Sequence, residues 1–292
     1  MPSWQGKSKG TTFGYSIFVA VIKKFGVLPA YLLLKVVSFY YFLFSWHSSK
    51  IIYNFYRNKL QFGKLKSLSK LYRNYYIFGQ TLIDKIAVMS SAENKFTFNF
   101  DGEHILRKIT AQQKGGMLLS AHIGNWEIAG FLLKRLDTKI NIVIFDGEHQ
   151  KIKQYLDSVT GEHTANFIII RNDLSHIYEI AAALKNNELV CMHADRFIEG
   201  NKTLTTDFLG HRAKFPLGPF LLAAQFKVPV SFVFAMKETN LHYHFFASEI
   251  KEYPTQSKDE FIKIMLTEFA AEMEKKVKDY PEQWFNYYDF WQ

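Results

Sequence analysis

The chain opens with long apolar stretches that lysines interrupt. Residues 13–22 and 28–44 are largely apolar, and Lys35 is the one charge within the second stretch. From residue 48 to about residue 89, apolar positions recur every three or four residues, which places them on one face of a helix. The pattern predicts apolar and amphipathic helices throughout residues 1–90, ending in a polar loop at 90–94.

After residue 95, short apolar runs alternate with segments of helical periodicity. The runs predict strands at residues 96–100, 117–121, 140–145, 167–170, 189–193, 232–235 and 241–250. The other segments predict helices at residues 104–113, 126–133, 151–159, 176–184 and 259–278, with one more opening at Gly218. Such alternation is typical of an α/β fold. We expect one α/β domain over residues 91–292, with a mainly parallel sheet flanked by helices.

One strand-to-helix junction carries candidate chemistry. Residues 120–127 read Ser-Ala-His-Ile-Gly-Asn-Trp-Glu, with Gly124 for a turn and Asn125 to cap the helix. His122 ends a buried strand, where open α/β sheets bind ligands. Glu127 follows about one helical turn later, and a histidine oriented by a carboxylate acts as a general base on a hydroxyl. The alternative is that His122 is a hydrogen-bonded histidine of the core.

Spacing alone does not select this histidine, because His244 and Glu249 are also five residues apart. That second pair falls on the strand predicted at 241–250. Residues five apart on a strand face opposite sides, so His244 and Glu249 cannot cooperate. The structural context therefore favours His122.

Composition and charge narrow the class of protein. The chain has 292 residues, of which 48% are hydrophobic and 17% aromatic, enough for a sizeable core and an apolar groove. The net charge of +9 suits an anionic membrane surface, an acidic protein or nucleic acid. The sequence holds no nucleic-acid-binding motif, so nucleic acid is not expected as a partner.

The N-terminal apolar stretches raise the question of a membrane. No small-residue cleavage site follows them, which argues against a secretory signal. Residues 28–44 approach the length that spans a bilayer, but Lys35 would lie near the bilayer centre, and basic residues lie on both sides. We therefore predict a helix pair lying in one leaflet. A spanning helix and a soluble helix pair covering the core are the alternatives.

Cys191 is the single cysteine, which excludes an intrachain disulfide and a cysteine-based zinc site. Its place in an apolar run predicts a buried structural thiol. The histidines lack zinc-ligand spacing, so no metal site is expected.

Residues 120–127 resemble the His-x4-acid block of the lysophospholipid acyltransferase superfamily, in particular the bacterial lipid A late acyltransferases and their stand-alone relatives. Further blocks match in the same order between about residues 13 and 291. The resemblance implies an acyltransferase fold with His122 as base, Glu127 as its orienting acid and Asn125 at the substrate. It implies no cofactor beyond an acyl thioester as co-substrate.

Three further blocks are similar to the family's binding blocks. Arg171 follows the apolar run at 167–170 and resembles the arginine that contacts the acceptor or its phosphate; an arginine there also suits an oxyanion. Asp195 would orient the acceptor or Arg196, and Arg196 would bind a phosphate. Gly218 opens a helix whose N-terminus would receive an anion. A surface arginine and a structural ion pair are the alternatives for the first two blocks.

The C-terminus departs from the family pattern. Residues 281–284 resemble its C-terminal signature, but Phe-Asn-Tyr-Tyr-Asp-Phe-Trp at 285–291 replaces the usual Trp, His and Arg pattern. The missing basic residues argue against a phosphorylated lipid A acceptor. Some stand-alone relatives, including ones associated with aryl polyene-type pigments, are more similar in this region.

The resemblance implies an acyltransferase at the cytoplasmic face of a bacterial inner membrane, held there as a peripheral or monotopic protein. It would move a fatty acyl group from acyl-carrier protein or acyl-CoA to a hydroxyl or amine of a lipid, with a lipid A precursor as one candidate. Alternatives are a different acceptor, such as an aryl polyene-type or amino-acid lipid, a lipid hydrolase, and a non-catalytic membrane-associated lipid-binding module.

Overall fold

The computed structural model describes residues 12–89, 95–145, 166–171, 173–197, 200–252 and 257–291. The chain forms two compact units. The first contains the residues up to Phe96 together with Val277–Phe290, and the second contains Thr97–Asp146, Thr164–Lys276 and the last two residues. The loop expected at 90–94 and the helix expected at 151–159 lie outside the described residues.

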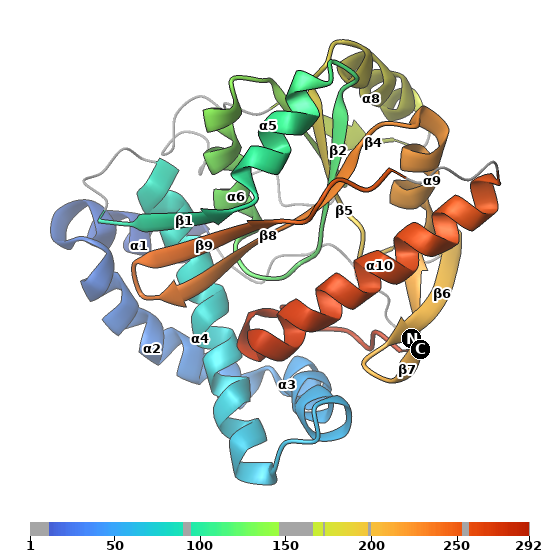
Figure 1. Ribbon diagram of the computed structural model, residues 1–292. Helices are drawn as coiled ribbons and strands as arrows, with labels where there is room; N and C mark the ends of the chain where they lie inside the picture. The colour runs from blue at the N-terminus through green and yellow to red at the C-terminus, as the bar shows by residue number, and fades with distance from the viewer. Residues whose placement is uncertain are drawn as a thin grey trace. The chain divides into compact units, whose positions relative to one another are not determined.

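Helices build the first unit, as the apolar pattern predicted (Figure 1). They are α1 (Thr12–Phe25), α2 (Val27–Phe44), α3 (Trp46–Asn54) with a π-helical turn at Phe55–Lys59, and α4 (Lys64–Met89). Helices α2 and α4 pack closely, because Gly79 has no side chain where Leu34 approaches. The buried Tyr31 hydroxyl donates a hydrogen bond to the buried carboxylate of Asp84 across the same contact.

The C-terminal segment Val277–Phe290 groups with the first unit, so the two units divide the chain differently from the domains expected at 1–90 and 91–292. The side-chain amide of Asn74 on α4 donates to the carbonyls of Glu282, at 3.0 Å, and Trp284, at 3.1 Å. The Trp284 ring lies 4.9 Å from Phe55, and Phe285 lies 5.0 Å from Phe78. Burial of these aromatic rings against helices far away in sequence places the C-terminal segment in the first unit. No local sequence signal marks this assignment.

The second unit is built on a seven-stranded sheet. In spatial order its strands are β1 (Thr97–Asp101), β9 (His242–Ala247), β8 (Val230–Thr239), β2 (Gly116–Ser120), β5 (Leu189–His193), β3 (Ile140–Phe145) and β4 (Asn166–Ile170). Neighbouring strands are parallel except β8 and β9. This confirms the mainly parallel sheet expected from the alternating pattern.

Helices cover both faces of this sheet. They are α5 (Glu103–Ala111), α6 (Trp126–Leu132) with a 3-10 turn at Leu133–Leu136, α8 (Ser175–Lys185), α9 (Leu217–Phe226) and α10 (Lys258–Asp279). Val233 of β8 belongs to a core cluster with residues of α5 and α6. The preceding residue, Phe232, points to the other face and meets Phe269 of α10 at 5.3 Å.

A hairpin outside the main sheet was not predicted. Strands β6 (Thr203–Phe208) and β7 (His211–Pro216) pair antiparallel, and β7 leads directly into α9. Its two-residue turn has positive φ at Leu209 (52°) and Gly210 (74°), as a type I′ turn requires. Leucine is an unusual residue for that conformation, so the sequence carries no Asn-Gly or Asp-Gly signal for the hairpin.

Candidate active site

The site lies at the carboxyl ends of neighbouring parallel strands. Strand β2 is central, with β5 on one side and β8 on the other. The register pairs Ser120, the last residue of β2, with His193, the last residue of β5. His122 lies two residues after Ser120, and Asp195 lies two residues after His193. Because the two strands end in register, His122 and Asp195 come together.

His122 and Asp195 make two hydrogen bonds. The ring Nδ1 of His122 lies 2.8 Å from Asp195 Oδ1, and the backbone N–H of His122 donates to Oδ2 at 2.9 Å. The Asp195 side chain is 1% exposed and that of His122 13% exposed. A carboxylate on Nδ1 keeps the proton there, which leaves Nε2, on the opposite side of the ring, to accept a proton.

Two further rings surround His122. Trp126, at the start of α6, presents its ring edge-on to His122 with the centroids 5.0 Å apart. The His193 ring centroid lies 4.3 Å from that of His122. Neither residue was expected at the site from the sequence; the signal for His193 was a polar residue at the end of an apolar run.

Electrostatics keep the imidazole of His122 neutral at neutral pH. Burial lowers its pKa below the ordinary value, the charge of Arg196 lowers it further, and Asp195 opposes both effects. Burial alone would raise the pKa of Asp195, but the interactions with His122, together with the Arg196 charge, hold it well below its usual range. The pair is therefore a neutral base hydrogen-bonded to an ionised acid.

The loop after His122 is fixed against β8. Gly124 has a φ of +65°, and a Cβ there would collide with the carbonyl oxygen of Ala235. The next residue, Asn125, donates its backbone N–H to the same oxygen at 2.8 Å. This close approach explains why glycine follows the histidine by two residues.

Asn125 caps α6, as expected. Its Oδ1 accepts the backbone N–H of Ile128 at 3.3 Å, and its Nδ2 donates to the Tyr243 hydroxyl at 3.2 Å. The residue is 2% exposed. The buried amide of Asn125 therefore positions the helix, and a substrate contact of this residue stays a prediction.

Glu127 lies in the first turn of α6 and is half-buried. The resemblance implied that Glu127 orients His122, but the structure places Asp195 on the Nδ1 atom of that ring. A carboxylate in the first turn also interacts favourably with the helix dipole. A catalytic role for Glu127 stays a prediction.

The structure does not bring Arg171 next to His122. It follows β4, the edge strand, three strands from β2, which is roughly 14 Å along the sheet. Its exposed guanidinium contacts Glu179 at 3.4 Å. Contact of Arg171 with an oxyanion or with another part of a substrate stays a prediction.

The two other predicted binding residues are Arg196 and Gly218. Arg196 follows Asp195 directly, is half-buried and acts on His122 through its charge. Gly218 lies in the first turn of α9, and no heavy atom lies within 4 Å of the position that a Cβ would take. Substrate binding by either residue stays a prediction.

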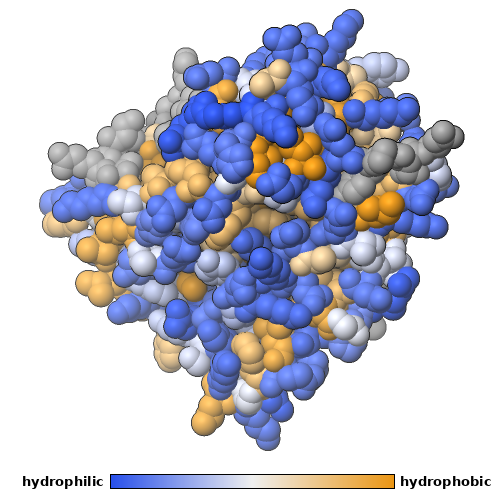
Figure 2. Space-filling view, viewed as in Figure 1, coloured by the Kyte–Doolittle hydropathy of each residue, from blue (hydrophilic) through white to orange (hydrophobic). Residues whose placement is uncertain are grey.

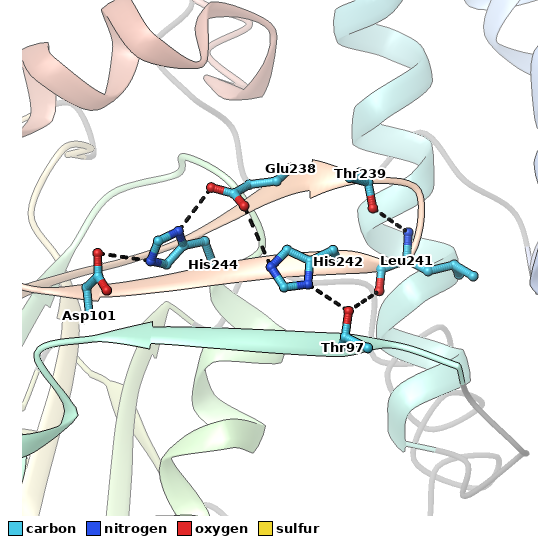
Figure 3. Close-up of polar contacts among 7 residues, drawn as sticks. All are labelled: Thr97, Asp101, Glu238, Thr239, Leu241, His242 and His244. Carbon is cyan, nitrogen blue, oxygen red and sulfur yellow. Dashed lines mark hydrogen bonds and ion pairs between the residues drawn. The ribbon is translucent and has the colours of Figure 1, made fainter.

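His244 and Glu249 do not pair, but not for the reason expected, because the strand ends at Ala247 and the two residues do not share it. Glu249 lies beyond the end of β9, and His244 instead contacts Glu238 Oε1 through Nδ1 and Asp101 Oδ2 through Nε2, each at 3.0 Å (Figure 3). Carboxylates therefore lie at both ring nitrogens of His244, whereas Asp195 engages one ring nitrogen of His122. Within the described parts of the chain, no three His, Cys, Asp or Glu residues are arranged to hold a metal ion.

Burial raises the pKa of the Cys191 thiol to about 12. Cys191 lies inside β5, between the apolar neighbours Val190 and Met192. Its thiol stays protonated at neutral pH, although the residue as a whole is half-buried, and its structural role stays a prediction.

No curated protein matches the sequence. The fold is similar to the crystal structure of the 1-acyl-sn-glycerophosphate (LPA) acyltransferase PlsC from Thermotoga maritima, with a TM-score of 0.39 and 14% identity over 86% of this chain and 98% of that one. That likeness is too low to compare the two sites. Residues 12–292 match the sequence profile of the bacterial lipid A biosynthesis acyltransferases, which is almost the whole chain, so the protein belongs to this acyltransferase family.

Proposed function

We propose that the protein transfers a fatty acyl group from an acyl thioester to a hydroxyl or amine of a lipid, with His122 as the general base. The observation that carries the proposal is the buried hydrogen bond between His122 Nδ1 and Asp195. It orients the ring, fixes the tautomer and leaves Nε2 as the proton acceptor.

In this mechanism the acceptor oxygen or nitrogen attacks the thioester carbonyl as Nε2 of His122 removes its proton. Asp195 stays ionised and stabilises the imidazolium that forms. The tetrahedral intermediate then collapses, the carbon–sulfur bond breaks, and His122 returns the proton to the leaving thiolate. Transfer is direct: the sequence has no Gly-x-Ser-x-Gly nucleophile motif, and the raised pKa of the Cys191 thiol keeps it protonated.

We propose acyl-carrier protein as the preferred donor, with acyl-CoA as the alternative. The net charge of +9 attracts an acidic carrier protein. Coenzyme A carries the same thioester but a smaller charged surface. A steep loss of the association rate with added salt is expected for the carrier protein.

We propose a lipid acceptor and leave a lipid A precursor, an aryl polyene-type lipid and an amino-acid lipid as candidates. The unusual C-terminal residues do not decide among them, because packing explains them. The ring centroids of Tyr287 and Tyr75 lie 5.8 Å apart, and those of Phe285 and Phe78 lie 5.0 Å apart, both within the first unit. The replaced basic residues therefore give weaker grounds against a phosphorylated acceptor than the sequence alone indicated.

We propose that α2 lies in one leaflet of the inner membrane, at its cytoplasmic face. By length and composition α2 is apolar enough to cross a bilayer, and most of it is not buried in the protein. Large apolar side chains on α1 and α2 are exposed, and Figure 2 shows apolar residues gathered where these helices lie in Figure 1. One face of α2 is covered by α4, and Lys35 interrupts it, which favours partial insertion over spanning.

Thioester turnover by the purified full-length protein tests the proposal. Thiol release and lipid products are measured with acyl-carrier protein or CoA thioesters, with and without a bacterial lipid extract. Acyl transfer that requires the extract and is lost in His122→Ala supports the proposal. Equal thiol release without lipid indicates a hydrolase, and no turnover with either donor indicates a binding module.

A further inference from the structure

His193 ends β5 beside the base and has no part in the mechanism above. Its ring centroid lies 4.3 Å from that of His122, with the planes tilted by 43°. The edge of Trp126 faces both rings, 5.5 Å from His193 and 5.0 Å from His122. Because β2 and β5 end side by side, the two imidazoles meet where a substrate of His122 must bind.

The imidazole of His193 is neutral at neutral pH. Burial lowers its pKa well below the ordinary value and His122 lowers it further; Asp195 opposes these effects, and Arg196 adds a smaller lowering. A neutral imidazole keeps one N–H donor. Because the His193 ring carries no positive charge, it does not compete with His122 for the Asp195 carboxylate.

The His193 ring is available for a ligand. Among the residues that the structure describes, the contacts to this ring are aromatic ones with His122 and Trp126, and none is a hydrogen bond. The side chain is half-buried rather than enclosed. A polar ring in this position stays partly desolvated until a hydrogen-bonding group reaches it.

Acyl transfer needs a donor for the oxyanion close to the base, because the reacting atoms lie about 3–3.5 Å apart. The backbone amides of the His122 loop are largely committed. The amide of His122 donates to Asp195, that of Ile123 to Ala121 and that of Asn125 to Ala235. Arg171 follows an edge strand roughly 14 Å away.

Building on the proposed acyl transfer, we propose that His193 is a second catalytic residue whose N–H hydrogen-bonds the thioester carbonyl oxygen. In the step, the acceptor oxygen bonds to the carbonyl carbon and its proton moves to Nε2 of His122. The carbonyl electrons move to the oxygen, which His193 stabilises without giving up its own proton. Collapse restores the carbonyl, breaks the carbon–sulfur bond and returns the proton from His122 to the thiolate.

His193→Phe tests the donor, because phenylalanine keeps an aromatic ring against His122 and Trp126 but has no N–H. The probe is dodecanoyl-coenzyme A, with a Gram-negative lipid extract as acceptor, and kcat and KM are measured for thiol release and lipid acylation. Loss of one oxyanion donor lowers kcat by about 10²–10³-fold. We expect that loss with a nearly unchanged KM for the thioester, and His193→Gln, which restores an N–H donor, should recover at least tenfold.

Folding is checked by thermal unfolding, and His193→Leu replaces the Phe variant if that variant unfolds early. A His193→Phe enzyme with near-normal kcat overturns the inference, as does a Gln variant no better than Phe, since either result indicates simple contact between rings. Both results require an active wild-type enzyme. A wild-type protein that transfers no acyl group from dodecanoyl-coenzyme A or the carrier-protein thioester overturns the proposed function, and the inference with it.

Discussion

His122 and Asp195 lie 73 residues apart in sequence and meet through a hydrogen bond of 2.8 Å. Both carboxylate oxygens of Asp195 are engaged, one by the His122 ring and one by its backbone N–H. The backbone hydrogen bond holds the Asp195 carboxylate in place while the same carboxylate orients the His122 ring. The geometry of the base therefore depends on how β2 and β5 are aligned.

Replacing His122 should abolish most of the chemistry. We expect His122→Ala to lower kcat for acyl transfer by about 10²-fold or more, the usual cost of losing a general base, while the fold survives. The measurement is the rate of lipid acylation, with circular dichroism as a check on folding. His244→Ala is the matched control, because that histidine contacts Glu238 and Asp101 instead. Near-normal activity in a folded His122→Ala protein would remove His122 from the mechanism.

The pH dependence should separate the two carboxylates. Activity needs neutral His122, so it falls as the pH drops through the pKa of His122, which lies below the ordinary value of about 6.5. Asp195 raises this pKa, so Asp195→Asn should lower it further and move the acid limb of the pH–rate profile to lower pH, together with a large loss of kcat. Glu127→Gln should leave the acid limb in place. A shift with Glu127→Gln and none with Asp195→Asn would restore Glu127 as the partner.

Gly124, in the loop after His122, should be required for stability. Gly124→Ala combines a φ of +65° with a collision at the Ala235 carbonyl, and we expect it to lose about 1–3 kcal/mol of unfolding free energy. Gly218→Ala is the control, since no atom lies within 4 Å of its new Cβ and alanine favours a helix. Denaturant unfolding measures both variants. Equal midpoints for Gly124→Ala and the wild type would contradict the strained turn.

Membrane attachment should depend on the exposed face of α2. Leu32, Val36 and Phe39 are exposed and lie three or four residues apart, so serine at all three should weaken binding to phosphatidylglycerol-containing vesicles. Serine at Leu174 and Tyr178, which are exposed in the second unit, should leave binding unchanged. Vesicle flotation measures both. Undiminished flotation of the α2 variant would contradict the proposed contact.

Local patterns determined much of this protein. Hydrophobic periodicity predicted the helices of the first unit, including the end of α4 at Met89, and the alternation that builds the mainly parallel sheet. The same patterns placed His122 at a strand end and Asn125 at a helix cap. These features depend on residues a few positions apart, which is the range over which a sequence pattern carries information.

Tertiary structure decided what links distant segments. The register of β2 with β5 places Asp195, rather than the neighbouring Glu127, on Nδ1 of His122 and brings His193 to its ring. Contacts of Asn74 with Glu282 and Trp284 assign the C-terminal segment to the first unit. Such contacts arise only when strands pair and side chains are buried together, and no spacing within the sequence encodes that pairing.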